Sequence, residues 1–329
     1  MGNLFVQPRQ ELANFNARWE ILPYHFKKDV VEHLDFKSRN SLQLCSSTDY
    51  DLVKSCPVFL EEITLRPPNK LLLPGGHYSV PKNRLVEMFI EFFNHPKSVI
   101  NTVKFDMSAK FGREYIEAEF LPILLEKLKI NPKFQARTKV LAWDGYFRNS
   151  LGEKFLQVLK HFNADDLECL NLCPEISSEY LDVMCETKQW KNAKKLVIIG
   201  NQEARLDKFL HFNELTIIRI DSLRPEEACS FIQNFISKNP PFKSFFQLQI
   251  CNPMAVQDIL QELDSQMKID RLKKREDGEY YRQQHFQLFT DELVLVVEIS
   301  DDFLYGTVCR RQFWMKDYYW ATWGRKVER

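Results

Sequence analysis

Six short segments of this chain repeat one pattern, in which apolar residues take the first, fourth and sixth positions. The copies are Leu60 to Leu65, Ile100 to Phe105, Leu167 to Leu172, Ala193 to Ile198, Leu215 to Ile220 and Phe245 to Ile250, with a looser copy around Leu141 and Trp143. The intervals between copies hold amphipathic stretches of helical period, such as Arg84 to Phe93 and Glu226 to Ile236. Short strands that alternate with helices predict an α/β fold in which each unit buries its apolar faces against its neighbours.

This strand-plus-helix period resembles that of a leucine-rich-repeat solenoid. The chain departs from that family three residues after the last apolar position, where an asparagine is usual. Glu175 takes this place after Leu172, and Leu223 takes it after Ile220. The turns therefore cannot use the buried asparagine ladder of that family, and a plain α/β domain whose strands merely look alike is the alternative.

The middle residue of each apolar-x-apolar triplet is expected to point away from the core, because side chains alternate along a strand. Thr64, Lys104, Asn171, Arg219 and Gln249 occupy these middle positions, and the remaining copy has Val197. A mixed row of this kind suits a protein partner better than a metal or a small metabolite. We expect the row to form a partner-binding surface, with the aromatic segment from Trp314 to Trp323 as the alternative.

Residues 16–57, before the repeats, show helical periodicity instead of alternation. Phe26, Val30, Val31 and Leu34 fall on one helical face after Pro23, and a second periodic run contains Leu42 and Cys45. The pattern predicts about three short helices. Because a bundle of some 40 residues is too small to bury all its apolar side chains, we expect it to dock on the rest of the chain or on a partner.

The spacing of these residues resembles that of an F-box. The matching positions are Leu22, Pro23, Phe26, Val30, Val31, Leu34, Leu42 and Cys45. The resemblance implies that they bind the Skp-family adaptor of a cullin–RING ubiquitin ligase. Arg39 stands where the family usually has leucine, and Thr48 stands where tryptophan is common, with Tyr50 as its expected substitute. An ordinary helical cap of a solenoid is the alternative.

A second set of residues resembles the FTH domain, which follows F-boxes in a large nematode family. The matching segments are Leu121-Pro122, Leu167 to Leu170, Gln189 to Lys194 and Phe209 to Phe212, so the resemblance covers residues 121–250 or so. It implies a substrate receptor without chemistry of its own. We expect Trp190 and His211 to be packing residues, because large aromatic side chains carry much of core burial.

Composition and glycine spacing exclude several classes of enzyme. No two of the ten glycines stand two or four residues apart, so the chain has neither a G-x-G-x-x-G dinucleotide loop nor a G-x-S-x-G elbow. The 45 basic residues balance the 45 acidic ones, which counts against nucleic acid as a partner. No cofactor and no catalytic residue is predicted, although a hydrolytic site using Asp165 or Asp166, His161 and a nearby cysteine is a third hypothesis.

The eight cysteines sit mostly inside apolar segments, and no C-x-x-C pair occurs. His161, Cys169, Cys173 and Cys185 form the nearest approach to a metal-ligand set, but they lack a recognised spacing, so no metal is predicted. The apolar runs are far shorter than the ~20 residues that a membrane helix needs. With no basic-then-apolar leader at the start, we expect reduced thiols, no membrane association and a cytoplasmic or nuclear protein.

These patterns predict an N-terminal tail (1–15), an F-box bundle (16–57), a strand-helix domain (58–265) and a C-terminal region (266–329). The C-terminal region contains a charged linker, a hairpin of Leu293 to Ile299 with Leu304 to Cys309, and an aromatic segment expected to cover the core. The leading hypothesis is a non-catalytic adaptor that recruits a protein to a ubiquitin ligase. A repeat-type interaction scaffold without a ligase link is the second hypothesis.

Overall fold

The chain divides into two compact units. The computed structural model describes residues 19–74, 76–81, 84–107, 116–145, 152–173, 176–202, 205–266, 270–271, 282–318 and 321. One unit consists of Met1–Phe59 with Phe92–Val99, and the other of Leu60–Glu91 with Ile100–Arg329.

The N-terminal unit contains three short helices, as predicted. They are α1 (Tyr24–His33), α2 (Phe36–Gln43) and α3 (Ser47–Lys54), preceded by a 3₁₀ turn, η2 (Trp19–Ile21). Pro23 immediately precedes α1, where its missing N–H costs nothing. Asp35 caps α2 by accepting a hydrogen bond of 2.7 Å from the Ser38 N–H, and Ser46 caps α3 by accepting one of 3.1 Å from the Asp49 N–H.

A single open sheet of thirteen strands dominates the rest of the chain, in the order β10-β11-β12-β13-β9-β8-β7-β6-β5-β4-β1-β2-β3. The strands are β1 (Phe59–Arg66), β2 (Lys70–Leu73), β3 (Gly76–Ser79), β4 (Val99–Asp106), β5 (Val140–Asp144), β6 (Cys169–Leu172), β7 (Lys195–Gln202), β8 (Glu214–Ile220), β9 (Phe245–Ile250), β10 (Asp270–Arg271), β11 (Arg282–Gln287), β12 (Leu293–Ile299) and β13 (Phe303–Arg310). All six copies of the repeated pattern therefore contain a strand.

The strands from β4 to β9 run parallel, and each one pairs with the next in the chain. Antiparallel strands extend the sheet at both ends. At one end, β12 and β13 form the predicted hairpin, in which Leu295 faces Val308 and Val297 faces Gly306.

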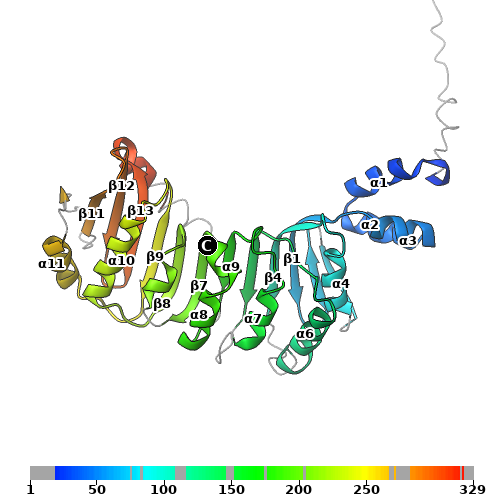
Figure 1. Ribbon diagram of the computed structural model, residues 1–329, viewed down its shortest axis with the longest axis horizontal. Helices are drawn as coiled ribbons and strands as arrows, with labels where there is room; N and C mark the ends of the chain where they lie inside the picture. Colours follow the sequence, from blue (N-terminus) through cyan, green and yellow to red (C-terminus); the bar gives the residue numbers. More distant parts are fainter. Residues whose placement is uncertain are drawn as a thin grey trace, which may run out of the picture. The chain divides into compact units, whose positions relative to one another are not determined.

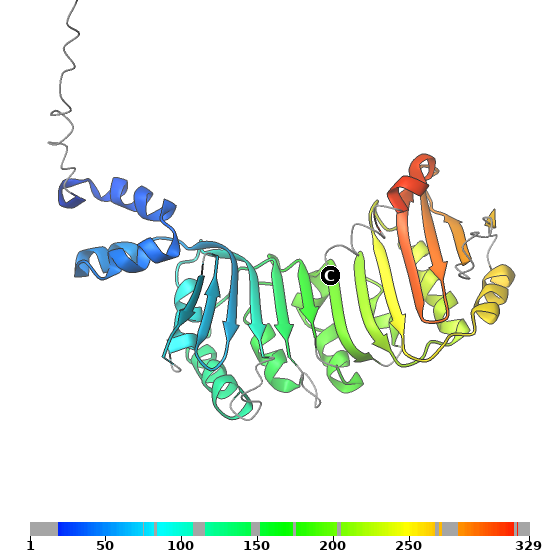
Figure 2. The ribbon, with the colours of Figure 1, turned by 180° about the vertical axis from the view of Figure 1, so that it is seen from behind.

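Helices cover one face of this sheet, and none of the described helices lies on the other face over the parallel strands (Figures 1 and 2). The elements of this layer are α4 (Arg84–Phe92), η3 (Ile116–Phe120), α6 (Leu121–Ile130), α7 (Glu153–Leu159), α8 (Ser178–Cys185), α9 (Lys188–Asn192), η4 (Leu206–Phe209), α10 (Pro225–Ser237) and α11 (Val256–Gln266). A right-handed strand-helix-strand connection repeated along the chain places every crossover on the same side.

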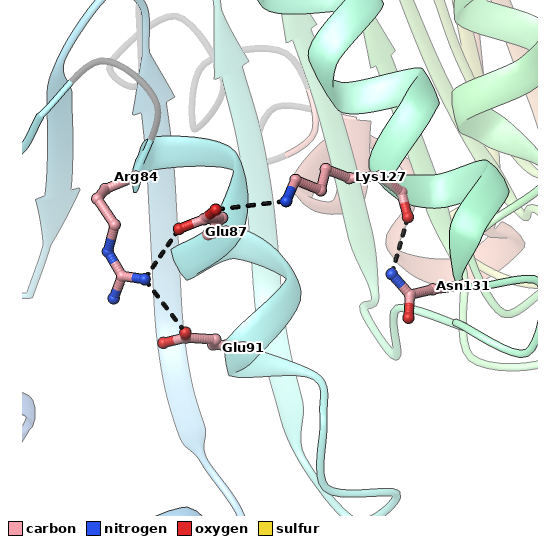
Figure 3. A network of polar contacts seen from close by, with 5 residues as sticks. All are labelled: Arg84, Glu87, Glu91, Lys127 and Asn131. Atoms are coloured by element: carbon pink, nitrogen blue, oxygen red, sulfur yellow. Dashed lines mark hydrogen bonds and ion pairs between the residues drawn. The ribbon is translucent and has the colours of Figure 1, made fainter.

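Neighbouring helices of the layer are joined by polar contacts at their exposed edges, as between α4 and α6 (Figure 3). Arg84 Nη1 lies 2.9 Å from Glu87 Oε2 and 3.5 Å from Glu91 Oε1, and Lys127 Nζ lies 3.3 Å from Glu87 Oε1. The hydrogen bonds from Arg84 and Lys127 lower the pKa of Glu87. Exposed pairs of this kind contribute little to stability, so the apolar contacts beneath them hold the layer together.

The core lies between the sheet and the helices. The repeated apolar positions are fully buried in most copies, including Ile63, Leu65, Val103, Phe105, Leu170, Leu172, Leu196 and Ile198. Phe105 of β4 lies 5.6 Å from Phe89 of α4 between ring centroids, which places this side of the strand under the helix. Trp190 is buried as predicted, edge-to-face against Phe212, and His211 Nε2 lies 2.8 Å from the Trp190 carbonyl oxygen.

The aromatic C-terminal segment covers part of the core, as predicted for the residues that the structure describes. Trp314 and Tyr318 pack against a cluster that includes Phe245, Val296 and Tyr305. Tyr319, Trp320 and Trp323 lie outside the described residues, as does most of the expected charged linker. The described part of this segment therefore contributes to packing on the sheet.

Candidate functional site

The three helices of the N-terminal unit bury one small core. Val31 of α1 packs with Leu52, Val53 and Cys56, and Trp19, Leu34 and Leu42 pack partly against this cluster. So few buried side chains leave much of the apolar surface of the helices in contact with solvent. This surplus is the feature that the helical pattern predicted.

An open groove of about 540 Å³ lies on the surface of these helices. It is lined by Trp19, Val30, Leu34, Lys37, Ser38, Ser41, Leu42 and Cys45, and we call these residues the bundle groove. The structure thus brings together four of the residues predicted to bind an adaptor, namely Val30, Leu34, Leu42 and Cys45. Apolar walls with a rim of hydroxyl groups suit a protein partner with an apolar ridge.

The other predicted adaptor-binding residues have different positions. Phe26 is 55% exposed and Pro23 is also exposed, whereas Leu22 is half-buried. Val31 was expected to face the adaptor, and this expectation is wrong, since Val31 has no exposed surface. It points into the bundle because Leu52 and Val53 of α3 pack on that side of α1.

Three exposed apolar residues of this surface escaped the sequence analysis. Leu44 is 84% exposed, Ile21 is 75% exposed and Tyr24 is 59% exposed. Ile21 and Tyr24 stand three residues apart on either side of Leu22-Pro23, a helical spacing that could have indicated them. Leu44 could have been found because Leu42, Leu44 and Cys45 crowd the end of one short helix, where they cannot all pack inward.

Trp19 supplies the aromatic anchor of the bundle. Its Nε1 donates a hydrogen bond of 2.6 Å to Asp49, and the Ser46 hydroxyl donates one of 2.7 Å to the same carboxylate. These two donors lower the pKa of Asp49. Tyr50, expected to substitute for a family tryptophan at Thr48, is 43% exposed beneath Lys54.

Arg39 is buried and joins three parts of the unit. Its Nη1 donates to the Pro57 carbonyl oxygen at 2.8 Å, its Nη2 to that of Glu32 at 3.1 Å, and its Nε to that of Leu34 at 3.2 Å. Burial lowers the pKa of the guanidinium group. Arg39 thus occupies a buried position where the F-box family usually has leucine. A leucine side chain could donate no hydrogen bond to these three carbonyl groups.

We expect Arg39→Met to lower the free energy of unfolding of the three helices by about 2 kcal/mol, because three carbonyl groups lose a charged donor while the cost of burying the charge is relieved. Hydrogen exchange of the amides in α1, α2 and α3 measures the change. Lys37→Met removes an exposed charge from the same helix and is the matched control. Equal exchange in both variants would contradict the role of Arg39.

The predicted partner-binding row on the sheet is broken into parts. Lys104 and Asn171 lie on one rung of the parallel strands, with Ala142 between them, and this rung continues through Val197 and Thr216. Gln249 lies on a second rung, that is, a second line of residues paired across the strands. Gln249 of β9 pairs with Ile218 of β8, and Ile218 pairs with Ile199 of β7. The row is therefore two rungs that combine polar with apolar side chains.

Two members of the row do not have the predicted exposure or placement. Thr64 is 5% exposed, and its hydroxyl donates to Glu62 at 3.0 Å, so it is not a surface residue. Arg219 lies where the register of β8 with β9 shifts, and its φ is 76°. This irregularity interrupts the alternation, so that Ile217 is buried in the place expected for Ile218.

Charges on this face of the sheet neutralise one another between neighbouring strands. Lys104 Nζ lies 3.0 Å from Asp144, Arg66 Nη2 lies 2.7 Å from Asp106, and Lys195 Nζ lies 3.1 Å from Glu214. Beside these pairs, the Asn171 Oδ1 atom is buried without a hydrogen-bond partner among the described residues. Such a surface favours a partner that brings apolar side chains and hydrogen-bond donors.

The residues of the hydrolytic hypothesis have structural contacts. Asp166 accepts two hydrogen bonds from Arg137, at 2.8 and 3.2 Å, and Asp165 N–H donates to the side chain of Asn163. Burial, together with the nearby Asp144 carboxylate, raises the pKa of the Cys173 thiol to about 12, which leaves it without nucleophilic character at neutral pH. The contacts of Asp165 and Asp166 belong to a turn that leads into β6, whereas Cys173 follows that strand.

Within the described ranges, no three His, Cys, Asp or Glu side chains are grouped as a metal ion would require. All eight cysteines are free thiols. None of the described helices has the length and apolar character needed to cross a bilayer.

Comparison with known families agrees with the two resemblances. A model of the F-box domain matches residues 19–61, a range that contains the bundle groove, and a model of the FTH domain matches residues 134–264. Neither the curated proteins nor the solved structures contain a match to the chain. The protein thus combines an F-box domain at residues 19–61 with an FTH domain at residues 134–264.

Proposed function

We propose that this protein is a substrate-binding subunit of a cullin–RING ubiquitin ligase. The bundle groove carries the proposal, because it lies in the F-box match and exposes apolar residues that would contact a Skp-family adaptor. Catalysis belongs to the partner subunits. The contribution of this chain is proximity, since holding a protein beside the activated ubiquitin turns a bimolecular encounter into an effectively intramolecular one.

The helix-free face of the parallel strands is proposed to receive the protein that is modified. Lys104, Asn171, Val197, Ile199 and Gln249 are its central residues, and they combine polar with apolar side chains. Successive parallel strands whose described crossover helices lie on one side also favour the interpretation as a leucine-rich-repeat-like solenoid. Within a ligase the protein would act in the cytoplasm or the nucleus.

Purification of the intact, tagged chain from cells tests the proposed association with the ligase subunits. Recovery of a Skp-family adaptor together with a cullin supports the proposal. The scaffold without a ligase link is the other candidate, because a helical cap would also expose apolar residues. Recovery of other partners without adaptor and cullin would favour that scaffold.

We expect Ile199→Asp to abolish co-purification of proteins bound to the sheet while adaptor binding is unchanged. Ile199 is 38% exposed, so the free chain tolerates the carboxylate, but an apolar contact would bury it without a partner at a cost of several kcal/mol. Quantitative mass spectrometry of purified complexes measures the loss. Val183→Asp makes the same kind of change on α8, where the side chain is 50% exposed, and serves as control. If both variants lost the same proteins, the result would contradict the assignment of the receptor surface to the sheet.

A further inference from the structure

A tight turn before β9 holds a lysine in an unfavourable backbone conformation. The Ser244 N–H donates a hydrogen bond of 3.0 Å to the Pro241 carbonyl oxygen and closes a four-residue turn. Lys243 is third in this turn, with φ of 72°, where glycine or asparagine is the usual residue. Its N–H donates to the Val308 carbonyl oxygen at 3.2 Å, which fastens the turn to β13. A glycine would satisfy the same backbone, but it would lack the contact of the lysine side chain, whose Nζ lies 5.6 Å from the ring centroid of Phe242.

An arginine clamped between two aromatic rings lies beside this turn. The Arg310 guanidinium carbon lies 5.1 Å from the ring centroids of both Phe242 and Phe313. Asp317 fixes the guanidinium group by accepting hydrogen bonds of 2.7 Å from Nη2 and 2.9 Å from Nε. The two rings keep 36% and 51% of their surface exposed, although each is held in place by the arginine. Phe242 and Phe313 thus form a preorganised aromatic surface, which we call the aromatic platform.

A pocket of about 600 Å³ opens between the turn and the platform. Phe242, Lys243, Thr307, Arg310, Lys316 and Asp317 contribute to its walls. Arg310 and Asp317 neutralise each other, whereas Lys243 and Lys316 have no ion-pair partner among the described residues. Three cations, Lys243, Arg310 and Lys316, and one carboxylate, Asp317, therefore give the pocket wall a net positive charge beside an aromatic ring that is only partly exposed. The volume of the pocket falls in the range of ordinary ligand sites.

We propose that this pocket binds an acidic peptide segment that carries an apolar or aromatic side chain, supplied by the protein that the ligase recruits. The acidic side chains would pair with Lys243 and Lys316, and the apolar side chain would lie against the exposed part of the Phe242 ring, which Arg310 and Lys243 contact as well. The inference rests on the proposed function and names the class of substrate segment. The balanced charge of the chain and the carboxylate in the pocket wall favour a peptide over a nucleic acid.

Fluorescence anisotropy of the full-length protein tests the pocket. The probe is a fluorescein-labelled decapeptide of glutamate with one central phenylalanine, and its counterpart has glutamine in place of glutamate. We expect Lys243→Gly with Lys316→Ala to weaken binding of the glutamate peptide about tenfold, as for two partly exposed charge pairs. Lys243→Gly is also expected to unfold at a temperature no lower than the wild type, because glycine relieves the strained turn.

Lys129→Ala with Lys160→Ala removes two exposed lysines from α6 and the end of α7, and this control should bind the peptide normally. Adaptor binding, measured on the same samples, separates failure of the pocket from failure of the proposed function. Unchanged peptide binding by the pocket variant would overturn the proposal, as would equal binding of the glutamine peptide. Tighter binding of an oligouridine would overturn it in favour of a nucleic-acid surface.

Discussion

Val30→Asp is expected to weaken binding of the Skp-family adaptor on the order of a thousandfold, because the complex would bury an unpaired carboxylate in the bundle groove. Val30 is 42% exposed in the free chain, so the variant should fold normally. Isothermal titration of the purified full-length protein with the adaptor measures the affinity. Hydrogen exchange of α1 to α3 verifies that the helices are intact.

Two further variants serve as controls for the adaptor affinity of Val30→Asp. Val183→Asp places the same change on an exposed position of α8 and should leave the affinity unchanged. Val31→Asp, one residue along the chain, should instead unfold the bundle, since Val31 has no exposed surface. A folded Val30→Asp variant that binds the adaptor as tightly as the wild type would refute the assignment of the groove.

Gly306→Ala should destabilise the larger unit by about 3 kcal/mol or more, because the added methyl group has no room. A Cβ atom at Gly306 of β13 would come closer than 3.0 Å to three ring atoms of Phe246 on the neighbouring strand β9. Phe246 cannot move away, since it is fully buried between Phe231 and Phe235 of α10, whose ring centroids lie 5.1 and 5.0 Å from its own. Urea unfolding followed by circular dichroism measures the loss.

A compensating substitution distinguishes this clash from a general intolerance of β13. Phe246→Leu alone should destabilise the protein, because it leaves a cavity next to α10. Together with Gly306→Ala the loss should be smaller than the sum of the two single losses, since the methyl group then occupies vacated space. Additive losses would show that the contact with Phe246 is not the cause.

The sequence determined the local features of this protein. Repeated apolar positions such as Ile63 and Leu65 predicted the strands, because alternation is a property of the extended backbone and needs no distant partner. The helical spacing after Pro23 predicted the bundle and its surplus of apolar surface for the same reason. The resemblances to the F-box and FTH domains rested on such spacings, and the family comparisons support both.

The tertiary structure alone decided which of these side chains meets solvent. Val30 and Val31 belong to the same apolar ridge, and only the packing of α3 buries the second one. Arg219 does not lie in the predicted row, because the register between β8 and β9 shifts at this residue. The acidic-peptide pocket could not be read from the chain, because Lys243 and Arg310 meet only through the pairing of β13 with β9. Periodicity assigns a residue to a face, whereas exposure depends on what distant parts of the chain place against that face.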